Sequence, residues 1–327
     1  LFRFKDDKMW FDQFKAAYGK STFTLNGYLS NVINYALKEN EPLKGNFKCT
    51  SAYLLVDEFM AYAGDTATAA DTTATGVVLV PANLSLVFNA DVNKLAYNGL
   101  ELEDFIGEMA IDSGKIKLKQ AGFNIIGAPV IMDAEYGSLS PVKAYFNYHI
   151  NAKEFDIKRA YNEIKLFRDL ATSAAGAEGI VSLDYTLGGK LGADMHPLYP
   201  SLKGAGVLSV KKVKMNGFKL FSAVGKETGK DSISNPDLSE VNIKTTIANN
   251  IITLERTKMK VAGFRPRFEG QVSFDGKLNL SGRLGLPPFG IIGIPFSVTG
   301  TQDKPVVKLR KQKDSDKIEE TTEEADQ

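Results

Sequence analysis

The segment Gly225-Lys226-Glu227-Thr228-Gly229-Lys230 has the composition of a loop that binds a nucleotide phosphate. Such a loop places four residues between its glycines and a Ser or Thr directly after its lysine, so that backbone N–H groups surround the phosphates. Here three residues separate the glycines, and Asp231 follows the lysine. Gly204-Ala205-Gly206 lacks the third glycine of a dinucleotide-binding turn. The sequence therefore predicts no nucleotide site at either segment.

An acidic cluster offers a second kind of chemistry, a carboxylate site for a metal ion. It consists of Glu101, Glu103, Asp104 and Glu108. The first two alternate with leucines, which is typical of the solvated face of a strand. No His or Cys lies nearby in the sequence to share a metal. We interpret the cluster as a solvated surface.

The two histidines and the single cysteine complete the search for reactive side chains. His149 lies in an alternating strand pattern, and His196 precedes Pro197 in a predicted loop. Cys49 shares the apolar positions of its strand, which predicts a buried thiol. Neither a Gly-x-Ser-x-Gly elbow nor a His-Glu-x-x-His motif occurs. We expect a protein that is not an enzyme, with no catalytic residues, no metal site and no cofactor.

The charge balance limits the partners. The 327 residues include 40 Lys and Arg against 39 Asp and Glu, a formal net charge of +1. No whole-chain field therefore attracts nucleic acid, and we expect no nucleic-acid partner. Residues 211–214 (KKVK), and Arg265 with Arg267, are candidate patches for phosphate head groups. Alternation favours a solvent-facing strand edge at these residues, and head-group binding is the alternative.

Alternation with period two dominates the sequence and predicts strands. One apolar parity runs through Phe268 and Leu280 on either side of Asp275-Gly276, a pair that predicts a two-residue hairpin turn. This apolar face either packs as a closed core or stays open as a groove for apolar ligands, and the sequence leaves both alternatives open. The candidates for lining such a groove are Phe268, Val272, Phe274, Leu278, Leu280, Leu284, Ile292, Ile294 and Phe296.

The sequence predicts a mainly β fold: an extended, twisted, largely antiparallel, groove-like sheet with one long and one short helix. The long helix has Asp156 as its N-cap, apolar residues at helical spacing, and Gly176 as its end. The short helix covers residues 219–228 and ends at Gly229. Strands are expected over residues 22–29, 43–56, 84–92, 115–120, 130–136, 142–150 and 180–187.

Composition divides the chain into four parts. Residues 1–61 form an N-terminal β segment that continues from a missing upstream region, because Leu1 already begins a strand pattern. Residues 62–83 are a flexible loop rich in Ala, Thr and Asp, and residues 84–310 form a C-terminal β domain. Residues 311–327, with three lysines against seven acidic residues, form a disordered charged tail. The nearly uncharged stretch 284–302 contains three prolines and is interpreted as strand and turn, not as a membrane span.

Several short segments are similar to one family of proteins. They are Phe155-Asp156-Ile157, Asn216-Gly217-Phe218-Lys219-Leu220-Phe221, Asn249-Asn250-Ile251-Ile252, Phe268-Glu269-Gly270, Asp275-Gly276-Lys277-Leu278 and Gly290-Ile291-Ile292-Gly293-Ile294-Pro295-Phe296. These segments resemble the C-terminal region of the AsmA family of bacterial envelope proteins. The likeness covers most of residues 84–310 and, more loosely, residues 1–61.

The resemblance implies a non-enzymatic periplasmic protein of a Gram-negative envelope, anchored in the inner membrane through an N-terminal helix that this chain lacks. It implies that a phospholipid or other acyl-chain lipid binds or moves along an apolar β-groove between the inner and outer membranes. Envelope assembly proteins would be further partners. The alternative is a structural or adaptor module for outer-membrane assembly with a closed apolar core.

Overall fold

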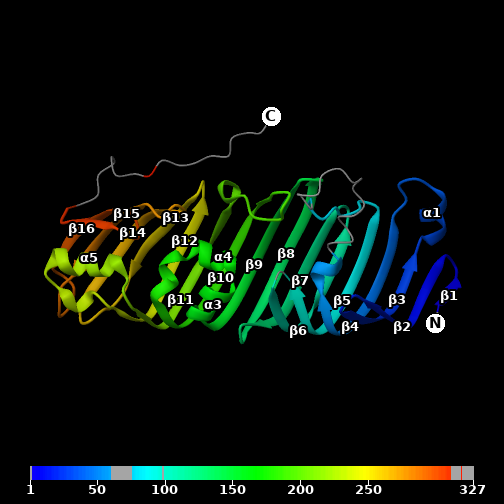
Figure 1. Cartoon of the computed structure of the whole chain (residues 1–327), viewed down its shortest axis with the longest axis horizontal. Helices are drawn as coiled ribbons and strands as arrows, with labels where there is room; N and C mark the ends of the chain where they lie inside the picture. The colour runs from blue at the N-terminus through cyan, green and yellow to red at the C-terminus, as the bar shows by residue number, and fades with distance from the viewer. Residues whose placement is uncertain (1, 60–75, 98, 311–317, 319–327) are drawn as a thin grey trace. The chain divides into compact units, whose positions relative to one another are not determined.

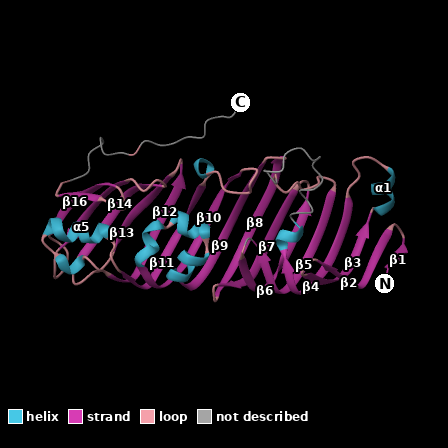
Figure 2. Cartoon of the chain, in the orientation of Figure 1, coloured by secondary structure: helices cyan, strands magenta, loops and turns pink. Residues whose placement is uncertain are grey.

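The computed structural model describes residues 2–59, 76–97, 99–310 and residue 318. The protein is mainly β, with one large, mostly antiparallel, open sheet of 17 strands and few helices (Figure 2). This confirms the fold class that alternation predicts. Residues 62–75 of the predicted flexible loop 62–83, and the predicted disordered tail 311–327 apart from Ile318, lie outside the described residues. None of the helices in the described part of the chain has the length and hydropathy of a membrane span.

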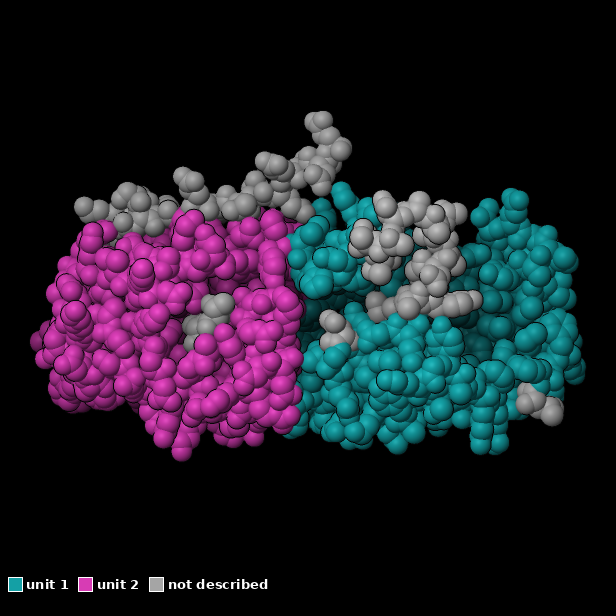
Figure 3. Space-filling model, in the orientation of Figure 1, with its two compact units in different colours: residues 1–150, 188–198 teal, residues 151–187, 199–327 magenta. Residues whose placement is uncertain are grey.

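The chain forms two compact units, which Figure 3 distinguishes by colour. Unit 1 comprises residues 1–150 and 188–198, and unit 2 comprises residues 151–187 and 199–327. The elements of unit 1 are β1 (Phe2–Lys5), β2 (Lys8–Tyr18), β3 (Ser21–Ser30), α1 (Val32–Leu37), β4 (Leu43–Leu55), β5 (Leu84–Tyr97), β6 (Leu100–Asp112), β7 (Lys115–Ile125) and β8 (Ala128–Ser140). Two further strands, β9 (Lys143–Asp156) and β10 (Ala177–Leu191), contribute residues to both units.

Unit 2 combines strands with most of the longer helices. Its helices are α3 (Ile157–Glu163), α4 (Lys165–Leu170), η1 (Thr172–Gly176), η2 (Tyr199–Ser201), α5 (Lys219–Thr228) and η3 (Asp231–Ile233). Its strands are β11 (Lys203–Met215), β12 (Asp237–Ala248), β13 (Ile251–Lys258), β14 (Arg265–Ser273), β15 (Leu278–Gly285), β16 (Gly293–Gly300) and β17 (Pro305–Lys308). Figure 1 shows α3, α4 and α5 lying across one face of these strands.

Consecutive strands pair with one another within each unit. In unit 1 the pairs from β1 to β4 and from β5 to β8 are antiparallel, whereas β4 and β5 are parallel. A parallel pair requires a crossover connection, which residues 56–83 supply. In unit 2, β11 to β17 form an antiparallel meander.

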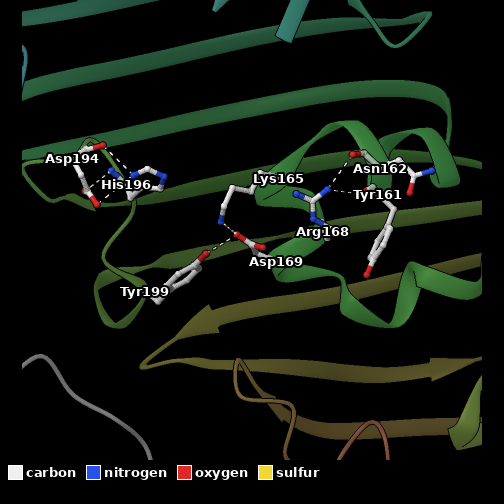
Figure 4. Close-up of polar contacts among 8 residues, drawn as sticks. All are labelled: Tyr161, Asn162, Lys165, Arg168, Asp169, Asp194, His196 and Tyr199. Atoms are coloured by element: carbon white, nitrogen blue, oxygen red, sulfur yellow. Dashed lines mark hydrogen bonds and ion pairs between the residues drawn. The ribbon is translucent and has the colours of Figure 1, made fainter. Parts of the chain in front are cut away.

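The predicted long helix at 156–175 is helical but interrupted. Asp156 is the N-cap, as predicted, and its carboxylate accepts a hydrogen bond from Arg159 N at 2.8 Å. The chain is extended at Ile164, with φ −107° and ψ 104°, and this residue separates α3 from α4. Arg168 compensates for the break, because its Nη1 donates to the carbonyls of Tyr161 and Asn162 at the end of α3 (Figure 4).

The short helix α5 begins and ends where the sequence predicts, at Lys219 and Thr228. Gly229 follows in the left-handed conformation, with φ 67°, and ends the helix. The turn at Asp275-Gly276 differs from the prediction. Gly276 N donates to Ser273 O, and Ser273 N donates to Lys277 O, which makes a three-residue turn with positive φ at Gly276.

Candidate functional site

One face of the unit 1 strands carries two rows of apolar residues. Residues directly opposite one another in neighbouring strands share a face of the sheet. The first row runs from β2 to β8 through Phe11, Gly27, Phe47, Phe88, Met109, Leu118 and Ala134. The second row, beside it, runs through Met9, Leu29, Gly45, Leu86, Ile111, Ile116 and Tyr136. We call these two rows the unit 1 apolar face.

The opposite face of the same strands carries charged and polar side chains mixed with apolar ones. Between the two apolar rows, a row that points the other way contains Trp10, Tyr28, Asn46, Val87, Ala110, Lys117 and Glu135. Lys117 and Glu135 form an ion pair at 3.4 Å, and the Glu135 carboxylate also accepts from Tyr145 Oη at 2.7 Å. The hydrogen bond from Tyr145, together with Lys115 and Lys117, lowers the pKa of the Glu135 carboxyl. The alternation along each strand therefore places the charged side chains on the face opposite the two apolar rows.

The unit 1 apolar face is only partly covered. Phe47 is buried, but most large side chains of both rows keep some exposure to solvent. At the β1 edge of the face, Phe2 and Phe4 are 57% and 55% exposed. Figure 3 shows a hollow in the surface of unit 1. A sheet face whose large apolar side chains stay partly exposed is compatible with a ligand-binding surface, because a closed core would bury these side chains.

Aromatic rings make the unit 1 apolar face continuous. Phe47 and Phe88 stack with ring centroids 5.3 Å apart, and Phe11 meets Phe47 edge-on at 5.5 Å. Phe14, in β2, meets Phe11 at 5.8 Å and Phe2 at 5.2 Å. Cys49, two residues after Phe47, is buried as predicted, and burial raises the pKa of its thiol. The ring contacts fix these side chains so that the face is preorganised for an apolar ligand.

The crossover covers the β8 end of the unit 1 apolar face. Val77 N donates to Pro141 O at 2.9 Å, and Val80 N donates to Ser138 Oγ at 3.1 Å. Tyr136 Oη donates to Val78 O at 2.8 Å. Val77 is buried in a small core with Ala144 and Leu191. Residues 77–80 thus pack against this end of the face.

The groove candidates that the sequence singles out lie in unit 2, and most of them are buried. Phe268, Leu278, Leu280, Leu284 and Phe296 are brought together in the interior, with Leu280 3% and Phe296 0% exposed. Val272, Phe274 and Ile294 are partly buried.

Helix α5 covers this cluster. Its Phe221 contacts Phe268 at 5.4 Å between ring centroids, and Phe268 contacts Phe296 at 5.5 Å. Val224 in the same helix is buried as well. At these positions the face has the burial of a closed core. The remaining candidate, Ile292, is 74% exposed in the loop between β15 and β16, apart from the buried cluster.

Comparisons with protein-family models, with curated proteins and with solved structures found no match to this chain. The likeness to AsmA proteins therefore stays a prediction from the sequence.

Two polar clusters of the described residues hold helices and turns in place. In unit 2, Asp169 accepts from Lys165 Nζ at 2.5 Å and from Tyr199 Oη at 2.7 Å, which ties α4 to η2 (Figure 4). Burial and the Asp169 carboxylate raise the pKa of Tyr199. In unit 1, the Asp194 side chain accepts from His196 N at 3.0 Å within one turn. No group of three or more His, Cys, Asp or Glu that could hold a metal ion occurs among the described residues.

The acidic cluster predicted to be solvated is surface-exposed, as its alternation indicates. Glu101 forms an ion pair with Lys94 at 2.5 Å, and Glu108 forms one with Lys119 at 3.2 Å. Ion pairs this exposed contribute little to stability. The unit 1 apolar face was missed as a site, although the alternation at residues 22–29, 43–56 and 84–92 predicts its strands correctly. Sequence alternation marks an apolar face but does not show which part of it a helix covers.

Proposed function

We propose that this protein is a non-enzymatic lipid-binding protein whose unit 1 apolar face holds the acyl chains of a phospholipid or other acyl-chain lipid. The observation that carries the proposal is the pair of apolar rows across β2 to β8, with most of their large side chains partly exposed. Each CH₂ group removed from water contributes about 0.8 kcal/mol, so an acyl chain binds such a face without specific polar contacts.

The dimensions of the face suit an acyl chain. Neighbouring strands lie about 4.8 Å apart, so a row that crosses the six gaps from β2 to β8 extends roughly 29 Å along the sheet. One acyl chain spans half of a bilayer's hydrocarbon core, about 15 Å. A row is therefore long enough for a whole acyl chain even where residues 77–80 cover its end.

The resemblance to AsmA proteins extends the proposal to a cellular role. On that basis the protein works in the periplasm of a Gram-negative cell, anchored in the inner membrane, and binds or conducts lipid between the inner and outer membranes. The second candidate function is a structural or adaptor module for outer-membrane assembly. The closed core under α5 in unit 2 favours it, because a packed interior holds no lipid.

Native mass spectrometry of the purified chain tests the proposal. We expect co-purified phospholipid on the unaltered chain, and substantially less on Phe88→Asp and Leu25→Asp, which place a carboxylate on the apolar side of the strands. The matched control for the first variant is Asn89→Asp, which places the same carboxylate on the adjacent, solvated position of β5. Phe88→Asp leaves the carboxylate within reach of water, so the variant should fold.

Circular dichroism and thermal melting of each variant separate a binding defect from a folding defect. A folded Phe88→Asp variant that keeps its full lipid load would overturn the assignment of lipid to this face. An unaltered chain that carries no lipid and takes up none from phospholipid vesicles would favour the adaptor function.

A further inference from the structure

Unit 2 carries a row of cations on directly opposed strand positions. Lys258 in β13 lies opposite Arg267 in β14, and Arg267 lies opposite Arg283 in β15. Arg265 lies two residues before Arg267 and therefore on the same face of β14. We call Lys258, Arg265, Arg267 and Arg283 the basic row. Like charges that face one another across strands repel, so the arrangement is unfavourable unless an anion lies against it.

The surrounding sequence supplies few carboxylates to neutralise the basic row. Between Glu255 and Glu269 the chain has five basic residues and no acidic one. Between Asp275 and Asp303 it has Lys277 and Arg283 and no acidic residue. Glu269 is already paired with Arg256, at 2.8 Å. Within the residues that the structure describes, no carboxylate forms an ion pair with a member of the basic row.

An exposed apolar loop adjoins the basic row. Residues 286–292 connect β15 to β16, and three of their side chains face solvent: Phe289 is 70%, Ile291 78% and Ile292 74% exposed. Large apolar side chains this exposed and this close in sequence are typical of an interaction surface. We call residues 286–292 the apolar loop.

The apolar loop is held in place by its own backbone and by the basic row. Leu286 N donates to Ile292 O, and Gly290 N donates to Leu286 O, both at 2.8 Å. Arg283 Nη2 donates to Ile291 O at 2.5 Å. A Cβ atom at Gly290, where φ is 71°, would come within 2.8 Å of the Arg265 side chain. The loop therefore packs directly on two arginines of the basic row, while its three apolar side chains stay exposed to solvent.

We propose that the apolar loop and the basic row together dock unit 2 on an anionic lipid bilayer. The three apolar side chains would enter the interface between head groups and acyl chains, while the lysine and arginines bind head-group phosphates. Charge complementarity selects this partner, because the anionic surface relieves the repulsion within the basic row as the loop inserts. The proposal concerns residues outside the unit 1 apolar face and does not depend on lipid binding there.

Vesicle flotation measures the docking. We expect the full chain to float with vesicles of an equal mixture of phosphatidylcholine and phosphatidylglycerol, more weakly with phosphatidylcholine alone, and less as salt is added. Each Lys or Arg near an anionic surface changes the partition coefficient roughly fivefold. The double variant Lys258→Gln, Arg265→Gln should therefore lower it by more than an order of magnitude. Its control, Lys44→Gln with Lys48→Gln, removes two exposed lysines from β4 and should bind as the unaltered chain does.

The apolar contribution has its own variant and control. Replacing Phe289, Ile291 and Ile292 by Ser should abolish flotation with the charges intact. Ile106→Ser with Ile131→Ser removes two exposed apolar side chains from β6 and β8 and should leave flotation unchanged. The chain has one tryptophan, Trp10, so Phe289→Trp in a Trp10→Phe background gives an unambiguous probe. On anionic vesicles its emission should shift to the blue and be quenched by brominated acyl chains.

Three results would overturn the proposal. The first is failure of the folded, unaltered chain to bind anionic vesicles, including the case in which it binds inorganic phosphate through the same row. The second is an equal loss of flotation in the control variants, which would mean that general surface charge or hydrophobicity carries the binding. The third is an unaltered chain that binds no vesicles but self-associates, together with a loop variant that stays monomeric. That result would make the loop a contact between copies of this chain. Circular dichroism of each variant confirms that it is folded.

Discussion

Phe47 of β4 and Phe88 of β5 stack with their ring centroids 5.3 Å apart and their planes 18° from parallel, across a parallel pair of strands in unit 1. The parallel register places the two rings directly opposite each other. Phe47 is buried and Phe88 partly exposed, so the pair lies where the buried interior of the sheet meets the open part of the unit 1 apolar face. Burial thus changes within one row of the face, and the more exposed ring is the one that we expect to contact lipid.

Removing the α3 N-cap should destabilise unit 2. Asp156→Ala loses the hydrogen bond from Arg159 N, and we expect the free energy of unfolding to fall by about 1 kcal/mol. Asp156→Asn keeps an oxygen that accepts the same bond and should retain most of the stability. Urea unfolding of the three proteins measures the difference. Equal losses in the Ala and Asn variants would show that the cap does not stabilise the helix.

The strands and helix ends that could be predicted are those that depend on local sequence. Alternation predicts β3, β4 and β10 to within a few residues, because a half-buried strand must alternate. Asp156 and Gly229 mark helix ends through their own side-chain or backbone chemistry. The break at Ile164 was missed because the apolar spacing continues through it, and the arginine that compensates for it lies a turn later.

The candidate site depends on contacts between residues far apart in the sequence. Alternation predicts the apolar face of β14 and β15 as correctly as that of β4 and β5. What distinguishes them is that α5 packs Phe221 on Phe268. The apolar loop could have been noticed as a cluster of large apolar residues beside prolines and glycines. Its relation to Arg265 and Arg283 follows only from the strand register.

The packing of residues 77–80 against Tyr136 of β8 should weaken at alkaline pH. Burial, together with the nearby Tyr97, raises the pKa of Tyr136 to about 12 from its ordinary value of 10.0. The folded state thus keeps the Tyr136 proton while the unfolded state loses it. The stability that depends on this proton is complete below pH 10.0 and is lost as the pH rises towards about 12.

Tyr136→Phe tests this prediction. It removes the hydrogen bond to Val78 O, which should cost about 1 kcal/mol at neutral pH, and it should also flatten the alkaline loss of stability. Thermal melting between neutral and alkaline pH measures both effects, and Tyr35→Phe, at an exposed position in α1, is the control. A Tyr136→Phe variant as sensitive to alkali as the unaltered chain would contradict the assignment.

Acid should loosen the contact between residues 56–59 and the β2–β3 turn. Glu58 accepts from Lys20 N at 2.8 Å and from Ser21 Oγ at 2.9 Å. The hydrogen bond from Lys20 N, with that from Ser21, lowers the pKa of the Glu58 carboxyl below its ordinary 4.5. Because the folded-state pKa is lowered, the stability is present above pH 4.5 and is lost as the pH falls through the lowered pKa.

The measurement is amide exchange at Lys20 and Ser21 as the pH falls. Protection of these two amides should decrease in acid in the unaltered chain and be absent at every pH in Glu58→Ala. Glu39→Ala, at an exposed carboxylate before β4, should match the unaltered chain. Full protection at Lys20 in Glu58→Ala would mean that another group holds the turn.

Two of the sequence-derived groove candidates should respond oppositely to the same substitution. Leu280 is 3% exposed beneath α5, so Leu280→Asp would bury an unpaired carboxylate. We expect a loss of about 4 kcal/mol or more, enough to threaten folding of unit 2. Ile292, in the apolar loop, is 74% exposed, and Ile292→Asp leaves its carboxylate in water. The free energy of unfolding of this variant should therefore stay within about 0.5 kcal/mol of that of the unaltered chain.

Urea unfolding measured on both variants, with lipid content determined on the same samples, checks the contrast. A stable Leu280→Asp variant that has lost bound lipid would mean that the face under α5 opens in solution and lines a groove. Unfolding of Leu280→Asp beside a native-like Ile292→Asp would place the closed core in unit 2 and leave the unit 1 apolar face as the surface that lipid can reach.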